Sequence, residues 1–377
     1  MSDGETVMEA PRRRFLKGAA AAAAGVAALG FPNVVKAQGP ISMRWQSTWP
    51  AKDIFHEYAN DFAKRVNDMT GGDLKIEVLP AGAVVPAFGL LDAVSKGTLD
   101  GGHGVLVYHY GKQTALALWG SGPAYGMDAN MLLSWHKYGG GKQLLDKLYK
   151  SINANVVSYP YGPMPTQPLG WFKSQIKSAD QIKGLKYRTV GLAADLFQAM
   201  GASVAQLPGG EIVPAMERGV IEGFEFNNPT SDRRFGAQDV AKNYMLGSHH
   251  QATEYFEVMI KRSKFNALPA EHQAILQYAA EATSSANEWK AMDYYSKDLQ
   301  ELISKDKVNV HRTPQAIFDA QIKAWDGLIT ELAKDPYMKK VMDSQKEWVR
   351  RVVFYNMMNA TDYKGAFNHH FPGVLKI

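Results

Sequence analysis

The stretch LLDAVSKGTLDGG, residues 90–102, returns about 120 residues later as IVPAMERGVIEGF, residues 212–224. Six positions correspond between the copies: Ala93 and Ala215, Lys96 and Arg218, Gly97 and Gly219, Leu99 and Ile221, Asp100 and Glu222, Gly101 and Gly223. Each copy predicts a helix that ends in a basic residue and a glycine cap, followed by an apolar–acidic–glycine step into a strand. Chance similarity is one explanation. The other is two similar α/β lobes, with a ligand cleft between them.

The rest of the chain alternates strands and helices around these copies. Before residue 100 we expect strands at 41–47, 74–79 and from Leu99, with a helix at 53–69. The middle of the chain predicts strands at 155–161, 169–174, 186–190 and 204–208, a short helix capped by Ser178 and a helix at 191–201. The last third predicts strands at 255–260 and 308–312 and helices at 269–306, 313–334 and 337–363. Such alternation is typical of an α/β fold with parallel or mixed sheets flanked by helices.

Composition indicates a globular chain of two domains. Of its 377 residues, 46% are hydrophobic and 21% are charged, an ordinary balance. The chain has no cysteine, which excludes disulfides, thiolate nucleophiles, iron–sulfur clusters and cysteine-ligated zinc.

The N-terminus predicts export. Twin arginines in RRRFLK, residues 12–17, precede an alanine- and glycine-rich run and a small-residue site at 35–37. We expect residues 1–37 to be a twin-arginine signal, cleaved after Ala37, because the apolar run is too short to span a bilayer. The remaining chain has 37 Lys and Arg against 34 Asp and Glu, a net charge of +3. That charge does not suggest a nucleic-acid partner.

Three segments of the middle region carry candidate ligand-binding residues: GPMPTQPLGWF at 162–172, GLKYRTVG at 184–191 and GFEFNNPTSD at 223–232. Arg188 lies in an apolar strand, so its guanidinium needs an anion. That anion is either a ligand carboxylate, which suits the planar fork, or Glu225 in an internal salt bridge. Gln167 and Glu225 offer oxygen atoms that could hold Na⁺ or Ca²⁺ together with a backbone carbonyl and ligand oxygens. Glu225 could equally be only a solvated or paired side chain.

The run from residue 184 to residue 232 resembles the solute-binding subunits of TRAP transporters, the tripartite ATP-independent periplasmic carriers of the DctP-like family. The similarity extends to MRWQSTWP at 43–50, AVSKGTLDGGHG at 93–104 and RSKFNALPAEHQAIL at 262–276. The branch it resembles binds 2-oxo acids and related monocarboxylates. The resemblance implies a two-lobed, type II-like periplasmic binding protein with a long inter-lobe helix and a long C-terminal helix. It also implies delivery of a pyruvate- or lactate-like anion to TRAP membrane subunits, without catalysis.

The resemblance also assigns roles to individual residues. Arg188 would bind the carboxylate. Gln167, Glu225 and the carbonyl of Phe226 would hold a cation, Ca²⁺ or Na⁺, which bridges to the ligand. The expected substrate-binding set is completed by Trp49, Tyr108, Asn227 and Gln251. Phe226 stands where relatives often have tryptophan, and the SHHQ loop that carries Gln251 departs from the family pattern.

The resemblance further suggests how the chain divides. One lobe would comprise residues 38–162 and about 249–290, and the other residues 163–248 and about 291–377. The C-terminal helix could exchange between two subunits to form a homodimer.

An exported enzyme acting on a small carboxylate is the main alternative, because the twin-arginine route carries folded, often cofactor-loaded proteins. The pairs His249-His250 and His369-His370 could bind a metal in such an enzyme. However, the chain has no G-x-S-x-G elbow, H-E-x-x-H helix or Walker loop. A sensory lobe of a gene regulator is a third possibility, but the export signal argues against it.

Overall fold

The computed structural model describes residues 39–375, so the predicted export signal lies outside the described residues. The strands form a five-stranded sheet and a six-stranded sheet. The first sheet has the order β2 (Leu74–Leu79), β1 (Ile41–Ser47), β3 (Gly101–Gly104), β10 (Tyr255–Lys261) and β4 (Val156–Pro163). The second has the order β11 (Asn309–Arg312), β9 (Asn243–Leu246), β5 (Gly170–Phe172), β8 (Gly223–Phe224), β6 (Lys186–Arg188) and β7 (Ser203–Ala205).

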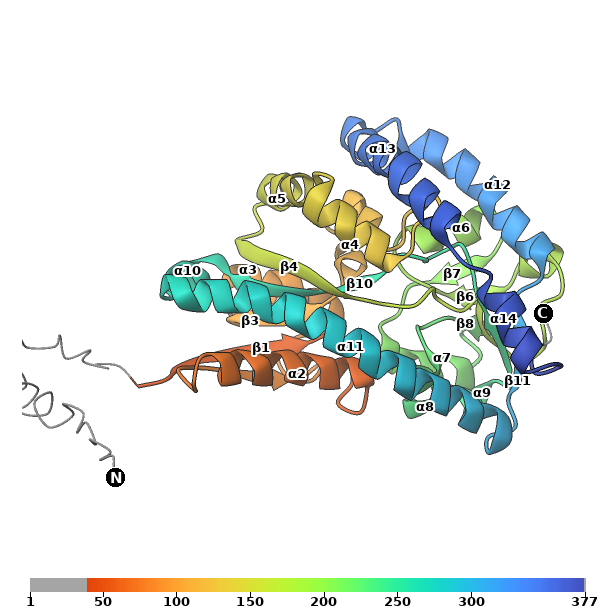
Figure 1. Cartoon of the computed structure of the whole chain (residues 1–377), viewed down its shortest axis with the longest axis horizontal. Coiled ribbons are helices and arrows are strands. Elements are labelled where there is room, and N and C mark those ends of the chain that lie inside the picture. Colours follow the sequence, from red (N-terminus) through yellow and green to blue (C-terminus); the bar gives the residue numbers. More distant parts are fainter. Residues whose placement is uncertain (1–38, 376–377) are drawn as a thin grey trace, which may run out of the picture. The chain divides into compact units, whose positions relative to one another are not determined.

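Helices flank both sheets (Figure 1). Around the first sheet these are α2 (Ile54–Met69), α3 (Leu90–Lys96), α4 (Ala129–Tyr138), α5 (Gly141–Ser151) and α10 (Arg262–Asn266). The second sheet region contains α6 (Leu192–Ala199), α7 (Ile212–Glu217), α8 (Pro229–Arg234) and α9 (Ala237–Val240). The last third adds α11 (Ala270–Ser304), α12 (Gln315–Leu332), α13 (Pro336–Asn359) and α14 (Tyr363–His370). Among residues 39–375 we find no helix whose length and hydropathy would let it span a lipid bilayer.

The expectation of an α/β fold with two mixed sheets and long helices is confirmed. Helix α11 is 35 residues long and packs against α2 and β4 of the first sheet region and against α8 of the second (Figure 1). The antiparallel strands are β10 in the first sheet and β5 in the second. The strand expected from Leu99 begins at Gly101 instead, because Leu99 and Asp100 still belong to the turn after α3.

The two copies of the repeat occupy equivalent places in the two sheets. The helix of each copy ends at a left-handed glycine, Gly97 with φ 87° and Gly219 with φ 68°. The strand that follows lies between one parallel and one antiparallel neighbour: β3 between β1 and β10, and β8 between β6 and β5. The duplicated sequence therefore encodes the same helix–turn–strand unit twice.

The shared acidic residue and the shared glycine explain why the units match. Asp100 accepts a hydrogen bond from the backbone N–H of Arg44, and Glu222 accepts one from that of Lys186, on the neighbouring parallel strand in each case. The glycine after each acidic residue admits an aromatic ring. A Cβ on Gly101 would lie 2.3 Å from the indole of Trp45, and one on Gly223 would lie 2.6 Å from the ring of Phe172. Only glycine fits at either position.

Two crossing segments join the sheets. The chain leaves the first sheet through residues 164–169 and returns through residues 247–254. The segments are hydrogen-bonded to each other, from Met164 N–H to the carbonyl of Glu254 at 2.9 Å and from Gln167 N–H to the carbonyl of Gln251 at 3.1 Å. Side chains on these segments consequently lie between the two sheets.

Candidate functional site

One buried cavity between the two sheets collects every site residue that the sequence predicts. Its lining includes Trp49, Tyr108, Gln167, Arg188, Glu225, Phe226, Asn227 and Gln251. The volume is about 20 Å³, which is enough for a single water molecule. Each of the two sheet regions contributes some of these residues, and the crossing segments contribute Gln167 and Gln251. The convergence arises because strand ends and crossing segments meet at the same place.

Arg188 is the charged centre of the cavity and is only 1% exposed. Its Nε donates to the carbonyl of Leu207 at 2.8 Å, and its Nη1 donates to the backbone carbonyl of Glu225 at 2.8 Å and to Glu225 Oε1 at 2.9 Å. The internal salt bridge that the sequence left open is therefore present. Nη2 is buried without a hydrogen-bond partner among the described residues. Nε and Nη1 of the guanidinium are thus bonded to other residues, which leaves Nη2 for a ligand in the cavity.

Two carboxyl groups share the cavity with Arg188. Burial raises the pKa of Glu225 to about 7, although the Arg188 guanidinium opposes the shift. Burial raises the pKa of Glu254 to about 8, and Glu254 accepts a hydrogen bond from Gln251 Nε2 at 2.5 Å. The sequence analysis missed Glu254. Its one signal was an acidic residue directly before an almost wholly buried strand, Tyr255–Lys261.

The oxygen atoms of the cavity suit a hard cation. Gln167 Oε1, Glu225 Oε2 and Gln251 Oε1 are buried without partners among residues 39–375. Buried acceptors of this kind normally have a hydrogen bond or a metal ion. In the same part of the chain no three His, Asp or Glu side chains converge as a metal site. The unpartnered oxygens are therefore one carboxylate oxygen and two side-chain amide oxygens, which are hard ligands of the kind that Na⁺ and Ca²⁺ prefer.

Aromatic rings form the apolar walls. The Trp49 ring centroid lies 5.7 Å from that of Tyr108, 5.0 Å from that of Phe55 and 6.4 Å from that of Phe226. Phe226 comes from the second sheet region, so its contact with Trp49 closes the cavity across the boundary between the sheets. The Arg188 guanidinium stands 5.8 Å from the Phe226 ring centre. The cavity is therefore lined by aromatic rings and charged groups that lie next to one another.

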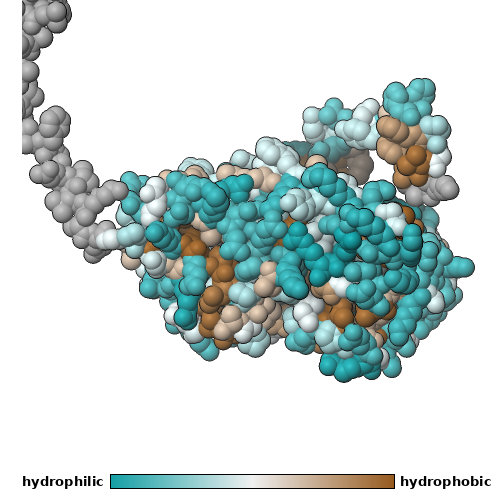
Figure 2. All heavy atoms as spheres, turned by 90° about the horizontal axis from the view of Figure 1, so that it is seen from below, coloured by the Kyte–Doolittle hydropathy of each residue, from teal (hydrophilic) through white to brown (hydrophobic). Residues whose placement is uncertain are grey.

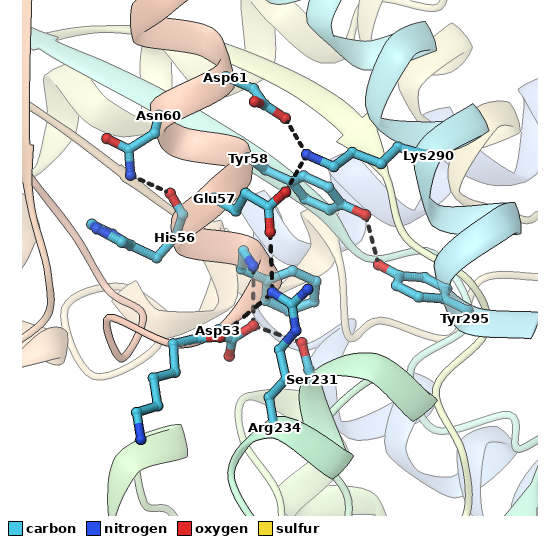
Figure 3. A network of polar contacts seen from close by, with 12 residues as sticks. Asp53, His56, Glu57, Tyr58, Asn60, Asp61, Ser231, Arg234, Lys290 and Tyr295 are labelled. Atoms are coloured by element: carbon cyan, nitrogen blue, oxygen red, sulfur yellow. Dashed lines mark hydrogen bonds and ion pairs between the residues drawn. The ribbon is translucent and has the colours of Figure 1, made fainter. Parts of the chain in front are cut away.

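Beside the cavity, a set of polar contacts joins the two sheet regions (Figure 3). We call it the α2 network; its members are Asp53, Glu57, Asp61, Ser231, Arg234 and Lys290. Ser231 donates to Asp53 at 2.7 Å, and Arg234 pairs with Glu57 at 3.1 Å, so both contacts run from α8 to α2 or its N-cap. Lys290 of α11 pairs with Glu57 at 2.5 Å and with Asp61 at 2.8 Å. The sequence analysis did not predict this network.

The histidine pairs proposed as metal ligands are placed elsewhere. His250 is fully buried and bonded through Nδ1 to Ser248 at 2.6 Å, whereas His249 is exposed, with its ring 5.1 Å from that of Phe318. His369 and His370 lie on the exposed helix α14. Neither pair lines the cavity.

Comparison with known proteins shows which family the chain belongs to. The family profile of bacterial extracellular solute-binding proteins, family 7 (DctP), matches residues 46–335. The monocarboxylate 2-oxoacid-binding periplasmic protein of Nostoc sp. is 33% identical over 339 residues, which cover 89% of each chain.

Solved structures are similar over the same range. A TRAP transporter solute-binding protein from Bordetella bronchiseptica, a dimer with calcium and picolinate in one site, has a TM-score of 0.81. It is 28% identical, and the match covers 88% of this chain and 97% of that one. The protein from Colwellia psychrerythraea with bound calcium and pyruvate has a TM-score of 0.78 at 28% identity, covering 88% of this chain and all of that one. The protein from Pseudoalteromonas atlantica with bound sodium and pyruvate has the same score and identity, covering 88% and 99%. This chain therefore belongs to the DctP family of extracellular solute-binding proteins, whose structures are those of TRAP transporter receptors and not of enzymes.

Proposed function

We propose that the protein binds a small 2-oxo or 2-hydroxy monocarboxylate, such as pyruvate or lactate, in the cavity around Arg188. The bound anion would then be delivered to the membrane subunits of a TRAP transporter. The observation that carries this proposal is Arg188 Nη2, a buried guanidinium nitrogen with two N–H groups and no hydrogen-bond partner among the described residues. A carboxylate is the anion that best satisfies such a donor. The ligands of the Nostoc, Colwellia and Pseudoalteromonas proteins support the class.

We infer that a cation is bound with the acid. Gln167 Oε1, Glu225 Oε2 and the Phe226 carbonyl would hold Ca²⁺ or Na⁺, and the cation would supply positive charge that offsets the carboxylate of the bound acid. The unpartnered oxygens of Gln167 and Glu225 support this assignment. With Glu225 held in its ionised form, Arg188 and Glu225 would both keep their charges in the loaded site. Trp49, Tyr108 and Phe226 would enclose the rest of the acid, while Asn227 and Gln251 would complete its polar contacts.

Binding requires the cavity to open. A three-carbon acid does not fit in about 20 Å³, so we propose that two lobes separate and close again around the ligand. The lobes would comprise residues 38–162 with about 249–290, and residues 163–248 with about 291–377. The two hydrogen-bonded crossing segments would form the hinge, and α11 would connect the lobes. Closure would be driven by contacts that the acid makes with both lobes at once.

We also propose a periplasmic location reached by the twin-arginine route and a homodimer built through the C-terminal helix. The export motif at residues 12–17 supports the route. The end of α13 and all of α14 expose large apolar side chains, namely Phe354, Tyr355, Met357, Met358, Tyr363, Phe367 and Phe371. Figure 2 shows a face on which most of the surface is hydrophilic, so such a run is unusual enough to indicate a subunit contact.

A thermal-shift screen of small carboxylates, with and without calcium, tests the proposed function. A ligand that binds only the folded state raises the melting temperature by mass action. We expect 2-oxo and 2-hydroxy acids to raise it most, and a chelator to reduce the shift. If no small carboxylate shifts the melting temperature in the presence of calcium or sodium, the proposed function is wrong.

A further inference from the structure

The wall residue Trp49 is held by a histidine that no comparison assigns to the site. Trp49 Nε1 lies 2.8 Å from Nδ1 of His103, and His103 Nε2 lies 2.6 Å from the hydroxyl of Tyr161. Trp49, His103 and Tyr161 are each at most 2% exposed. The chain of contacts therefore runs from the cavity wall into the middle of the five-stranded sheet, where His103 on β3 lies between β1 and β10.

Hydrogen-bond chemistry sets the tautomer of His103. An indole N–H can only donate, so His103 Nδ1 must accept and carries no proton. Burial lowers the pKa of His103 to about 3, which keeps the imidazole neutral. Its single proton is then on Nε2 and is donated to the Tyr161 oxygen. One imidazole thus makes two hydrogen bonds with fixed directions.

Packing removes the remaining freedom of the imidazole. The His103 ring lies 5.0 Å from the Phe256 ring, and the His103 backbone is paired with Ser47 of β1 and Val258 of β10. A fixed His103 restricts the orientation of the Trp49 indole, whose ring packs against those of Tyr108 and Phe226 in the cavity wall. Because the Trp49 side chain is already ordered in this way, it loses little conformational entropy when a ligand binds.

We propose that His103 is a positioning residue for ligand binding, which acts by holding the Trp49 indole in the orientation that completes the cavity wall. This inference rests on the proposed function, since it concerns the same cavity. His103 does not line the cavity and acts only through Trp49.

The chain supplies a matched control. Trp119 Nε1 donates to Nδ1 of His136 at 3.2 Å, and both residues are buried outside the cavity. His103→Leu and His136→Leu therefore each remove one buried imidazole acceptor from one indole. His103→Asn keeps an acceptor oxygen close to the place of Nδ1 and serves as the conservative variant.

The first test is the indole ¹H–¹⁵N spectrum of the full-length protein, with the Trp49 signal identified by its loss in Trp49→Phe. We expect the Trp49 N–H to move upfield and to exchange faster with water in His103→Leu, and to return toward its wild-type position in His103→Asn. An unchanged Trp49 signal in His103→Leu would overturn the inference. This result does not depend on whether any acid binds, so it separates failure of the inference from failure of the proposed function.

The second test is pyruvate affinity in the presence of calcium. Leaving the buried indole N–H without a partner should weaken binding about tenfold in His103→Leu, with most of the loss regained in His103→Asn. His136→Leu should lower stability without changing affinity. In a Trp49→Phe background, His103→Leu should have little further effect, because the two residues act as one unit. Additive losses, or equal losses in His103→Leu and His136→Leu, would show that His103 has only a structural role.

Discussion

Two groups of ion pairs in this protein have the same chemistry but opposite surroundings. In the cavity, Arg188 and Glu225 pair at 2.9 Å with side chains that are 1% exposed. In the α2 network, Arg234 and Glu57 pair at 3.1 Å with side chains that are 30% and 39% exposed. The cavity pair is costly to desolvate, and within residues 39–375 Arg188 Nη2 and Glu225 Oε2 have no hydrogen-bond partner. The ion pairs of the α2 network are partly exposed to solvent, whereas its Asp53–Ser231 hydrogen bond is buried.

The difference indicates distinct roles: the cavity pair is suited to recognising a ligand, and the α2 network connects the two sheet regions. Unpaired atoms of buried charges gain most from a partner, so the proposed anion and cation would have their largest effect in the cavity. Solvated pairs contribute little individually. Their arrangement matters more, because Glu57 on α2 pairs with Arg234 of α8 and with Lys290 of α11.

The largest expected effect comes from removing each arginine in turn. Arg188→Met leaves the Glu225 carboxylate buried without its partner, so we expect a loss of about 3–5 kcal/mol in the free energy of unfolding. Pyruvate binding should also become undetectable. Arg234→Met is the matched control and should cost about 1 kcal/mol or less. Thermal unfolding and calorimetric titration measure both quantities. Equal effects of the two substitutions would show that burial does not distinguish the pairs.

The next prediction separates the two oxygens of Glu225. Oε1 accepts from Arg188, whereas Oε2 lacks a partner among the described residues. Glu225→Gln keeps an oxygen for Arg188 but removes the charge offered to a cation. We therefore expect the affinity for pyruvate to lose its dependence on calcium, while Glu57→Gln, the control, keeps it. Calcium dependence that survives in Glu225→Gln would place the cation elsewhere.

The α2 network should give a smaller effect that salt removes. Glu57→Gln weakens the contacts of α2 with both α8 and α11, so we expect pyruvate to bind a few-fold more weakly at low ionic strength, because closing the lobes completes these pairs. At high ionic strength the variant and the wild type should have similar affinities, since exposed pairs are screened. A difference between them that persists in high salt would contradict this account of the network.

The pH dependence of stability should be the mildest effect. Burial raises the pKa of Asp232 to about 7 and that of Glu254 to about 8, from ordinary values of 3.8 and 4.5. Between pH 6.5 and pH 8 the unfolded chain has already released these protons, whereas the folded chain releases them only as the pH rises through about 7 and about 8, so the stability of the ligand-free protein should fall over this interval. Below pH 6.5, buried His103 and His250, whose pKa values are lowered to about 3, act in the opposite direction.

Thermal unfolding of the ligand-free protein between pH 6.5 and pH 8 checks the sign of this dependence. A melting temperature that stays constant or rises over that interval would show that Asp232 and Glu254 are already ionised in the folded state.

Local patterns predicted the repeated unit well, because its glycines and acidic residues each perform a local task. Gly97 and Gly219 cap helices, and Asp100 and Glu222 bind the neighbouring strand. The direction of β10 and β5 could not be predicted, since it depends on where the crossing segments return. The predicted cavity residues converge because they lie at strand ends, on the loops that follow them and on the crossing segments.

Long-range partners were beyond sequence reasoning. Asp53 and Ser231 are separated by 178 residues, and Glu57 and Arg234 by 177, so no spacing links them. His103 was visible only as part of a glycine-rich motif, and its role depends on the rotation of one ring against Trp49. Such contacts follow from packing in three dimensions, on which a one-dimensional pattern carries no information.

The central claim is that Arg188 and Glu225 complete their hydrogen bonding and coordination with a ligand. A crystal structure of the protein grown with calcium and pyruvate tests it most directly. We predict the pyruvate carboxylate within hydrogen-bond distance of Arg188 Nη2, and calcium coordinated by Gln167 Oε1 and Glu225 Oε2. Pyruvate bound elsewhere, with Arg188 Nη2 still lacking a partner, would contradict the account.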